Sequence, residues 1–245
     1  MLKRKRLFKI FLRSFLVQAS WNTSRMQGLG FAYAICPLVE EEGRRGSPET
    51  SALLARHLQR FSTHPYLAAS IIGSVSRLEA EKRFSETADL KNALMGPYAA
   101  IGDPFFWGSL RPFAGIVSVC FAIKGFFFAP LLFLILYNPA HLWVRLRGFI
   151  AGWQQGKNGV EFIRRLELPR MSGWIRWGAT ILLGFAAYLA CTTGPFPALF
   201  LQGLPGQVGG LGVVLASFLA VRKGIPPLTL LYGSVLLFAS AMMMQ

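Results

Sequence analysis

The chain has 245 residues, of which 53% are apolar and only 15% charged, and its formal net charge at pH 7 is +15. Soluble domains carry about 25% charged residues, so this composition indicates a membrane protein with a polar portion attached. The basic residues cluster at the N-terminus and between the hydrophobic segments, which is the positive-inside arrangement. They do not form one basic face interleaved with stacking aromatics, which argues against a nucleic-acid partner.

The chain carries no sequence signature of a catalytic or metal centre. Cys36, Cys120 and Cys191 are widely separated and form no CxxC pair, which indicates neither a disulfide framework nor a zinc site. No HExxH, GxSxG or P-loop sequence occurs, and His57 and His141 have no acidic residue at metal-ligand spacing. We therefore expect no metal, no cofactor and no enzymatic activity of the chain on its own.

The opening stretch MLKRKRLFKIFLRSFLVQASW resembles a signal peptide only superficially, because Lys9 and Arg13 interrupt its apolar run. Lys5, Lys9 and Arg13 follow helical spacing. An apolar stripe on another side consists of Phe8, Phe11, Leu12, Phe15 and Ala19. This pattern predicts a basic amphipathic helix that lies in the membrane interface and binds anionic lipids. A helix packed on a soluble core is the alternative.

Residues 1–89 are expected to form an N-terminal interfacial and cytoplasmic helical region. The stretch LVEEEGRRGSPET predicts a loop, and Ser47 followed by Pro48 predicts a helix start. A further helix is expected over Ala68–Phe84. The charges around its end are expected to form a solvated cytoplasmic face; they are Glu79, Glu81, Lys82, Arg83, Glu86 and Asp89.

The remaining chain predicts a membrane core over 90–140, a basic cytoplasmic segment over 141–176 and C-terminal membrane spans over 177–245. One crossing is expected at Phe113–Tyr137, because it is long enough for a hydrocarbon core of about 30 Å. The later crossings are expected at Trp177–Thr193, Val208–Val221 and Ile225–Met244. The fold class is thus an all-α membrane protein, in which N-terminal amphipathic helices precede a multi-span core with broken or re-entrant helices.

The stretch MGPYAAIGDPFFWGSLRP, residues 95–112, contains Asp103, the one acid between Leu90 and Gly159. An ionisable group at membrane depth is costly unless it pairs, lines a polar path or binds substrate. Asp103 could pair with Arg111 or cap a helix. The residues expected to set bends in this stretch are Gly96, Pro97, Gly102, Pro104 and Gly108.

Three stretches identify a family resemblance: FLRSFLVQASWNTSRMQGLGFAYAICP, RHLQRFSTHPYLAASIIG and LMGPYAAIGDPFFWGSLRP. Weaker matches are LFLILYNPAHLWVR and GWQQGKNGVEFI. The chain resembles the IID membrane component of the mannose/fructose/sorbose-type sugar phosphotransferase system (PTS) over most of residues 10–185. It departs from the family after about residue 185, where only residues 193–207 remain of a longer extracytoplasmic insertion.

The resemblance implies a multi-pass protein of the bacterial inner membrane that pairs with a IIC subunit to form a channel for a hexose or related sugar. IIA and IIB proteins would relay the phosphoryl group to the incoming sugar and carry the phosphohistidines, so no phosphoryl transfer is expected at His64. A membrane scaffold or sensor that docks PTS phosphocarriers without transport is the alternative.

A sugar site also selects residues by their chemistry. A carboxylate such as Asp103 accepts charge-assisted hydrogen bonds from sugar hydroxyls, and Trp107 offers an aromatic face for stacking on a pyranose. Asn22 and Gln27 carry amides that donate and accept together. These residues, together with Arg111, are the expected substrate contacts. Packing, pairing or backbone hydrogen bonding is the alternative for each of them, and for Asp103 the structural role is slightly favoured.

Overall fold

The computed structural model describes residues 4–39 and 47–193, and in the C-terminal part residues 212, 215–226, 228–230, 232–234 and 236. Every named element in these residues is helical. The chain divides into two compact units, Met1–Gly184 and Phe185–Gln245. The elements are α1 (Arg4–Ser14), α2 (Gly28–Ile35), η1 (Cys36–Leu38), α3 (Pro48–His57), α4 (Ala68–Ala80), α5 (Phe84–Gly102), η2 (Asp103–Leu110), α6 (Arg111–Ile123), α7 (Ala129–Gln155), η3 (Gly156–Gly159), α8 (Val160–Arg165) and α9 (Leu168–Thr193).

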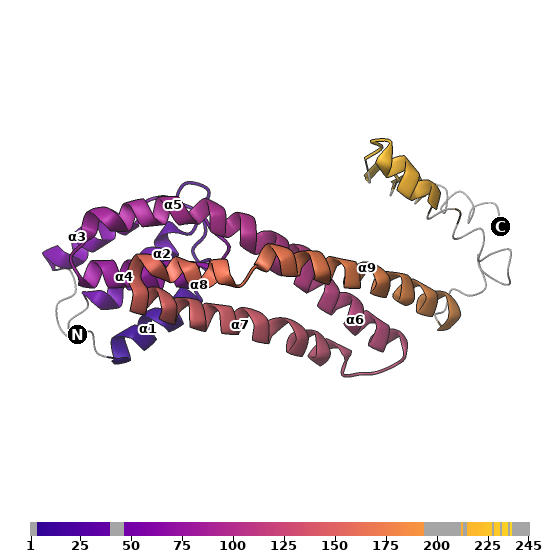
Figure 1. Ribbon diagram of the computed structural model, residues 1–245, viewed down its shortest axis with the longest axis horizontal. Coiled ribbons are helices and arrows are strands. Elements are labelled where there is room, and N and C mark those ends of the chain that lie inside the picture. The colour runs from indigo at the N-terminus through magenta and orange to yellow at the C-terminus, as the bar shows by residue number, and fades with distance from the viewer. Residues whose placement is uncertain are drawn as a thin grey trace. The chain divides into compact units, whose positions relative to one another are not determined.

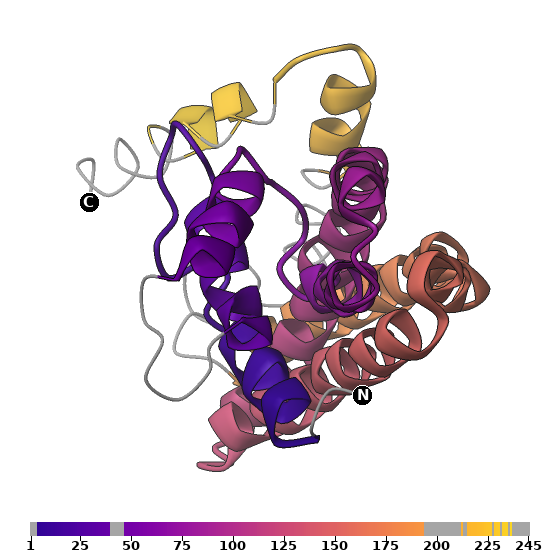
Figure 2. The ribbon, with the colours of Figure 1, turned by 90° about the vertical axis from the view of Figure 1, so that its left-hand side faces the viewer.

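Within the first unit, long helices run lengthwise and the N-terminal helices pack at one end of them (Figure 1). Seen end-on, α1, α2 and α3 lie to one side of α5 and α7 (Figure 2). The core at this end is built from buried side chains that include Phe31 of α2, Phe61 of the loop between α3 and α4, and Ile72 of α4.

A helix forms in the opening stretch as predicted, but α1 ends at Ser14, so Phe15 and Ala19 of the predicted apolar stripe lie beyond it. The rest of the stripe is divided. Ile10 and Ser14 are buried and Phe11 packs against the core, whereas Phe8 and Leu12 remain 62% and 50% exposed. The helix therefore packs on the protein through one face and presents apolar side chains on another.

The helix start at Ser47–Pro48 is confirmed: the Ser47 hydroxyl accepts a hydrogen bond from the Thr50 backbone N–H, and Pro48 opens α3. The predicted helix over Ala68–Phe84 is too long, because α4 ends at Ala80 and Phe84 begins α5. The turn between them places Lys82 at φ +60°.

Glu79 was expected in a solvated charged face, and that expectation is wrong. Its side chain is only 3% exposed and receives hydrogen bonds from both Arg56 and His57. The neighbouring acids behave as expected of surface residues, since Glu81 and Glu86 form exposed ion pairs with Arg83.

Helices α4 and α7 form the closest helix pair of the unit, because small residues line their seam. A Cβ added at Gly73 would lie 2.4 Å from the Phe149 carbonyl oxygen, and one at Gly152 would lie 2.4 Å from the Ser70 carbonyl oxygen. Backbones approach this closely only where side chains are absent, as in the small-xxx-small seams of membrane helices.

The backbone runs from α5 through η2 into α6 as one helical path. The bends expected within 95–112 therefore do not break the helix. Proline removes a backbone donor, and the chain accommodates Pro104 in the first turn of η2, a π-helix of eight residues. This path, Phe84–Ile123, has 40 residues and is the one helix in the described ranges that is long and apolar enough to cross a membrane. At 1.5 Å per residue it is about 60 Å long, roughly twice the hydrocarbon core.

The single crossing predicted at Phe113–Tyr137 is also wrong. The chain turns back at residues 124–128, where Gly125 adopts φ +82°, and Pro130 lies in the first turn of α7. Apart from Lys124 this short turn is apolar, which hides it from a hydropathy reading: Phe126, Phe127 and Phe128 follow Gly125, and Phe127 is 94% exposed.

The later helices begin and end away from the expected segment boundaries. Helix α7 continues through His141 to Gln155, and α9 begins at Leu168, before the predicted span at Trp177–Thr193. Residues 194–207 of the predicted turn lie outside the described residues, as do half of the residues of the two last predicted crossings; residues 215–222 are helical.

Candidate functional site

The site begins at the loop between α3 and α4, which carries His64. Gln27 fixes this loop: its side-chain amide donates to the Thr63 carbonyl oxygen at 2.7 Å and accepts from the Thr63 backbone N–H at 3.1 Å. Gln27 is 3% exposed. Both halves of its amide are therefore engaged in holding the loop.

The His64 side chain packs from the loop onto η2. Its ring stacks on Phe106 with centroids 5.0 Å apart and lies 4.7 Å from the Trp107 ring. A Cβ at Gly102 would come within 2.4 Å of the His64 Cβ. Gly102 thus serves close packing against His64 rather than a bend. By contrast, Gly96 has open space around it, and the nearest neighbour of a Cβ at Gly108 is the Asp103 carbonyl oxygen at 3.6 Å.

Helix α7 completes the group of rings. Tyr66 stacks on His141 with centroids 4.3 Å apart, and its hydroxyl lies 3.1 Å from that of Tyr137. The Arg145 guanidinium lies over the Tyr66 ring at 4.8 Å and over the Phe15 ring at 4.6 Å. We call this group the aromatic–histidine cluster; its rings are His64, Tyr66, Phe106, Trp107, Tyr137 and His141.

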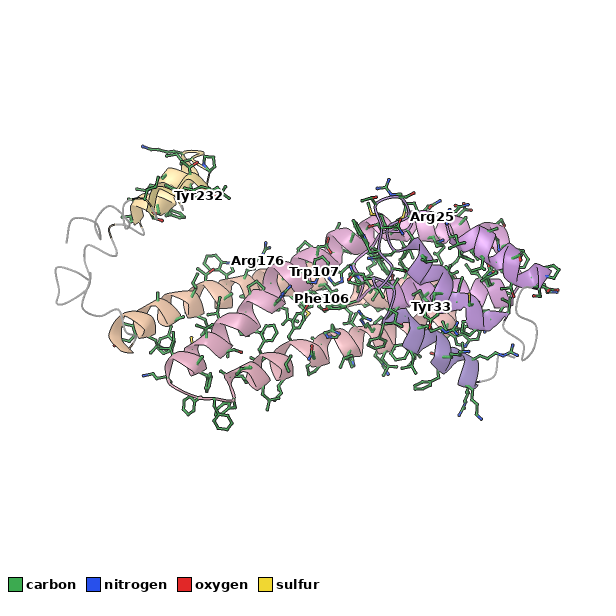
Figure 3. All side chains as sticks on the ribbon, turned by 180° about the vertical axis from the view of Figure 1, so that it is seen from behind. Arg25, Tyr33, Phe106, Trp107, Arg176 and Tyr232 are labelled. Carbon is green, nitrogen blue, oxygen red and sulfur yellow. The ribbon has the colours of Figure 1, made fainter. Side chains whose placement is uncertain are left out.

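The cluster joins segments that are far apart in sequence. The loop segment STHPY, the segment GDPFFWG and the α7 segment YNPAHLWVR each supply two of its rings. Figure 3 shows the labelled Phe106 and Trp107 on η2, beside the part of α9 that carries Arg176. Sequence analysis singled out the first two segments, but it did not predict that α7 would meet them.

Several buried polar atoms in this cluster have no hydrogen-bond partner among the described residues. They are His64 Nε2, His141 Nδ1 and the Nε and Nη1 atoms of Arg145. Arg145 is 5% exposed, so its charge is balanced by the faces of Tyr66 and Phe15. The carboxylate oxygen Asp103 Oδ1 lies 4.0 Å from His64 Nε2, beyond hydrogen-bond distance.

Asp103 lies at the edge of the cluster, with its side chain 51% exposed. It follows α5 without a helix start, and within the described ranges it forms no ion pair with Arg111. Trp107, one turn further along the same face, is 41% exposed, and Arg111 continues that face. We call Asp103, Trp107 and Arg111 the exposed stripe.

Asn22 lies apart from the exposed stripe, in the turn before α2. Its side-chain oxygen accepts from the Arg25 backbone N–H at 2.8 Å, and its side-chain nitrogen donates to the Ser20 carbonyl oxygen at 3.3 Å. Its amide is therefore used to shape the turn.

A pair of serines holds the π-helix in place. The Pro104 carbonyl oxygen accepts hydrogen bonds from the Ser109 hydroxyl at 2.7 Å and from the Ser172 hydroxyl of α9 at 3.2 Å. The two hydroxyl oxygens lie 2.5 Å apart. The Ser172 hydroxyl therefore ties α9 to the backbone that carries the exposed stripe.

A second polar network lies away from the stripe, between α3 and α4. His57 Nε2 donates to Glu79 at 2.9 Å, and Arg56 donates to the other carboxylate oxygen at 2.7 Å. Burial lowers the pKa of His57 despite its contact with Glu79. Burial alone would raise the pKa of Glu79, but the hydrogen bonds from His57 and Arg56 hold it below its usual value.

The family model described as the PTS system mannose/fructose/sorbose family IID component matches residues 1–187. The chain belongs to this family. It is 37% identical over 158 residues to the mannose-specific EIID component of Escherichia coli K12, covering 62% of this chain and 56% of that protein. It is 35% identical over 187 residues to the fructose permease IID component of Bacillus subtilis 168, covering 74% and 66%.

Solved structures agree with the assignment to this family of membrane proteins. The mannose transporter ManYZ, solved in complex with microcin E492, superposes with a TM-score of 0.61 at 28% identity, covering 98% of this chain and 96% of that one. A second structure, described as a membrane protein, gives a TM-score of 0.73 at 25% identity over the same shares. The chain aligns with only slightly more than half the length of the E. coli relative.

Proposed function

We propose that this IID component is the membrane subunit of a mannose-type PTS transporter. It would form with a IIC subunit the route by which a hexose or related sugar enters the cell while IIB phosphorylates it. Related proteins are named for mannose, fructose and sorbose, so the sugar is proposed only as a class. The protein would be multi-pass and lie in the bacterial inner membrane.

The observation that carries this proposal is the exposed stripe on η2. Asp103 and Trp107 remain about half exposed although the rings behind them are buried. A carboxylate beside an indole face matches the hydroxyls and the apolar face of a pyranose. Gln27 and Asn22, whose amides serve the protein backbone, are proposed to support the site rather than touch the sugar.

The N-terminal helix is proposed to rest on the membrane surface. Phe8, Leu12 and Leu16 are each at least half exposed on α1 and the turn after it, and Lys5 and Lys9 are exposed on the same helix. Apolar side chains beside lysines fit the interface of a membrane that contains anionic lipids.

The test compares Asp103→Asn and Trp107→Ala with Trp177→Ala, which removes an equally large and 71% exposed ring from α9. We expect the two stripe variants to lower sugar uptake at least tenfold while their recovery with the IIC subunit stays normal. Trp177→Ala should retain uptake. Normal uptake in both stripe variants would remove them from the sugar route.

A strain that lacks only this chain separates transport from scaffolding. Loss of uptake, with a stoichiometric IIC subunit purified alongside the tagged protein, supports the transporter subunit. Retained uptake would make the chain a scaffold for PTS phosphocarriers.

A further inference from the structure

A pocket of about 280 Å³ lies where the end of α7 meets α8, away from the exposed stripe. Its polar lining combines two cations, two amides and one acid: Arg147, Arg165, Gln154, Gln155 and Glu161. With Glu161 counted, the lining carries a net positive charge. No part of the proposed sugar route uses this pocket.

The donors of the pocket are available to a ligand. Arg147 forms no ion pair or hydrogen bond within the described part of the chain, and it is exposed. The Arg165 Nε lies 3.5 Å from Glu161 Oε1, a loose contact for a charged pair. Guanidinium groups bind phosphate oxygens in bidentate fashion, and the amide N–H groups of Gln154 and Gln155 add further donors.

An apolar strip leads away from the pocket along α7. Trp143, Leu146 and Ile150 are spaced along one side of the helix, and each is between 37% and 49% exposed. The Trp143 ring packs against Phe162 of α8, which itself lines the pocket, with centroids 5.8 Å apart. A free phosphate would gain nothing from this strip, whereas an acyl chain would bury it.

The depth of the pocket along α7 fits a lipid headgroup. By composition α7 is less apolar than a spanning helix, but Arg145, one of its charged residues, is buried against the protein. The helix rises about 27 Å from Ala129 to Arg147 at 1.5 Å per residue, close to the thickness of a hydrocarbon core of about 30 Å. At the other end, the exposed rings of Phe126, Phe127 and Phe128 form an aromatic tip suited to one membrane interface. With that tip at one interface, Arg147 lies at the level of the opposite headgroups.

We propose that this pocket binds the phosphate of an anionic phospholipid, with an acyl chain along Trp143, Leu146 and Ile150. The ligand is a phosphodiester held by Arg147 and Arg165 and assisted by the two glutamine amides. The site stands whether or not the chain transports sugar, because none of its residues belongs to the exposed stripe.

The experiment is native mass spectrometry of the full-length protein, purified with its co-purifying subunits in mild detergent and titrated with phosphatidylglycerol. We expect one saturable adduct that phosphatidylcholine of the same chain length does not form. Arg147→Gln and Arg165→Gln should each weaken it about fivefold, the effect of one basic residue near an anionic headgroup. Arg164→Gln is the matched control, because it removes the same charge from the residue adjacent to Arg165. Arg164 is 83% exposed and does not line the pocket.

Glu161→Gln supplies a test in the opposite direction. Removing the carboxylate that competes for Arg165 should tighten phosphatidylglycerol binding several-fold, an effect that a misfolded variant would not produce. Equal losses in Arg164→Gln and Arg165→Gln, or no gain in Glu161→Gln, would overturn the proposal.

Competition identifies the source of the phosphate. Inorganic phosphate and glucose 6-phosphate at millimolar concentration should leave the lipid adduct in place. Displacement by either one would assign the pocket to a soluble phosphate ligand instead. If the arginine variants lose a co-purifying phosphocarrier protein but keep the lipid, the pocket is a protein-docking site and the lipid proposal fails.

Discussion

Glu79 shows how a single buried carboxylate depends on its partners. It lies between Arg56 and His57 with its side chain almost fully buried. Removing one partner of such a group leaves an uncompensated charge, which typically costs about 3 kcal/mol or more. The network belongs to the packing of α3 on α4 and not to the exposed stripe.

The stability of the protein should therefore fall in acid. The pKa of Glu79 is held below its unfolded value of 4.5, so its contribution is present above that pH and lost as the pH falls through the folded pKa. The pKa of His57 is lowered below 6.5 by burial, so protonation also favours the unfolded state and the loss begins just below pH 6.5. The midpoint of thermal unfolding in detergent, measured from pH 7.5 to 4, should fall accordingly.

Glu79→Gln should lower the midpoint of thermal unfolding at pH 7, and it should make that midpoint less dependent on pH between 7.5 and 4. Glu81→Gln, which changes an exposed carboxylate two residues away, is the control and should leave both nearly unchanged. A wild-type slope in Glu79→Gln would show that other groups cause the acid sensitivity.

For individual residues, the sequence predicts interactions between near neighbours in the chain better than contacts between distant residues. The Ser47 cap and Pro48 could be located from sequence because their interactions lie within four residues. His57, the hydrogen-bond partner of Glu79, lies 22 residues earlier in the sequence. A run of charged residues does not indicate which of them will be buried. The two hydrogen bonds between the Gln27 side-chain amide and the Thr63 backbone could not be predicted for the same reason, because the two residues are 36 positions apart.

Among the elements, the contact between α5 and the His64 loop depends on one missing side chain. Gly102 leaves room for His64, whereas Gly96 on the same helix has open space. Gly102→Ala should force the loop away from η2, with an overpacking cost of about 1–3 kcal/mol, and should lower uptake by displacing His64 from Trp107.

Gly96→Ala is the matched control, because it adds the same methyl group to the same helix without a clash. It should leave uptake unchanged and keep or slightly raise the unfolding midpoint, since alanine favours helix. If both variants behave alike, the close approach at His64 does not govern the site.

The stretch 95–112 illustrates what proline and glycine do and do not predict. They correctly mark an irregular backbone, but the irregularity is a π-helix inside a continuous helical path rather than a turn. The decisive residues are Ser109 and Ser172, whose hydroxyls satisfy the Pro104 carbonyl. Ser172 lies on α9, so only the tertiary structure reveals the support.

For the molecule as a whole, composition was sufficient to predict an all-helical membrane protein, and three motifs were sufficient to predict the family. The helix boundaries between residues 113 and 176 were not predicted. The turn at 124–128 contains three phenylalanines and a single charge, Lys124. Arg145, a charge that suggested a cytoplasmic segment, is buried under aromatic rings. Hydropathy does not distinguish residues that face lipid from residues that are buried inside the protein.

The hairpin of α6 and α7 predicts a topology that can be measured. In a cysteine-free background that retains uptake, Phe127→Cys should react with a membrane-impermeant maleimide on intact cells, because the proposed orientation puts the basic end of α7 in the cytoplasm and the tip at residues 126–128 on the opposite side. Arg164→Cys, at the basic end, should react only after permeabilisation. The reverse pattern would invert the orientation, and labelling of both from one side would mean that α7 does not cross the membrane.

The contact between Phe15 and Arg145 also sets an order of events during synthesis. The ring of Phe15 leaves the ribosome about 130 residues before its partner, which at about 5–20 residues per second is a delay of roughly 7 to 26 seconds. Throughout that interval α1 has no α7 to pack on, and its apolar side chains need another cover. We expect the lysine-flanked helix to spend this time at the surface of the bilayer, which would hold the N-terminal part of the chain at the membrane before the rest of the protein is made.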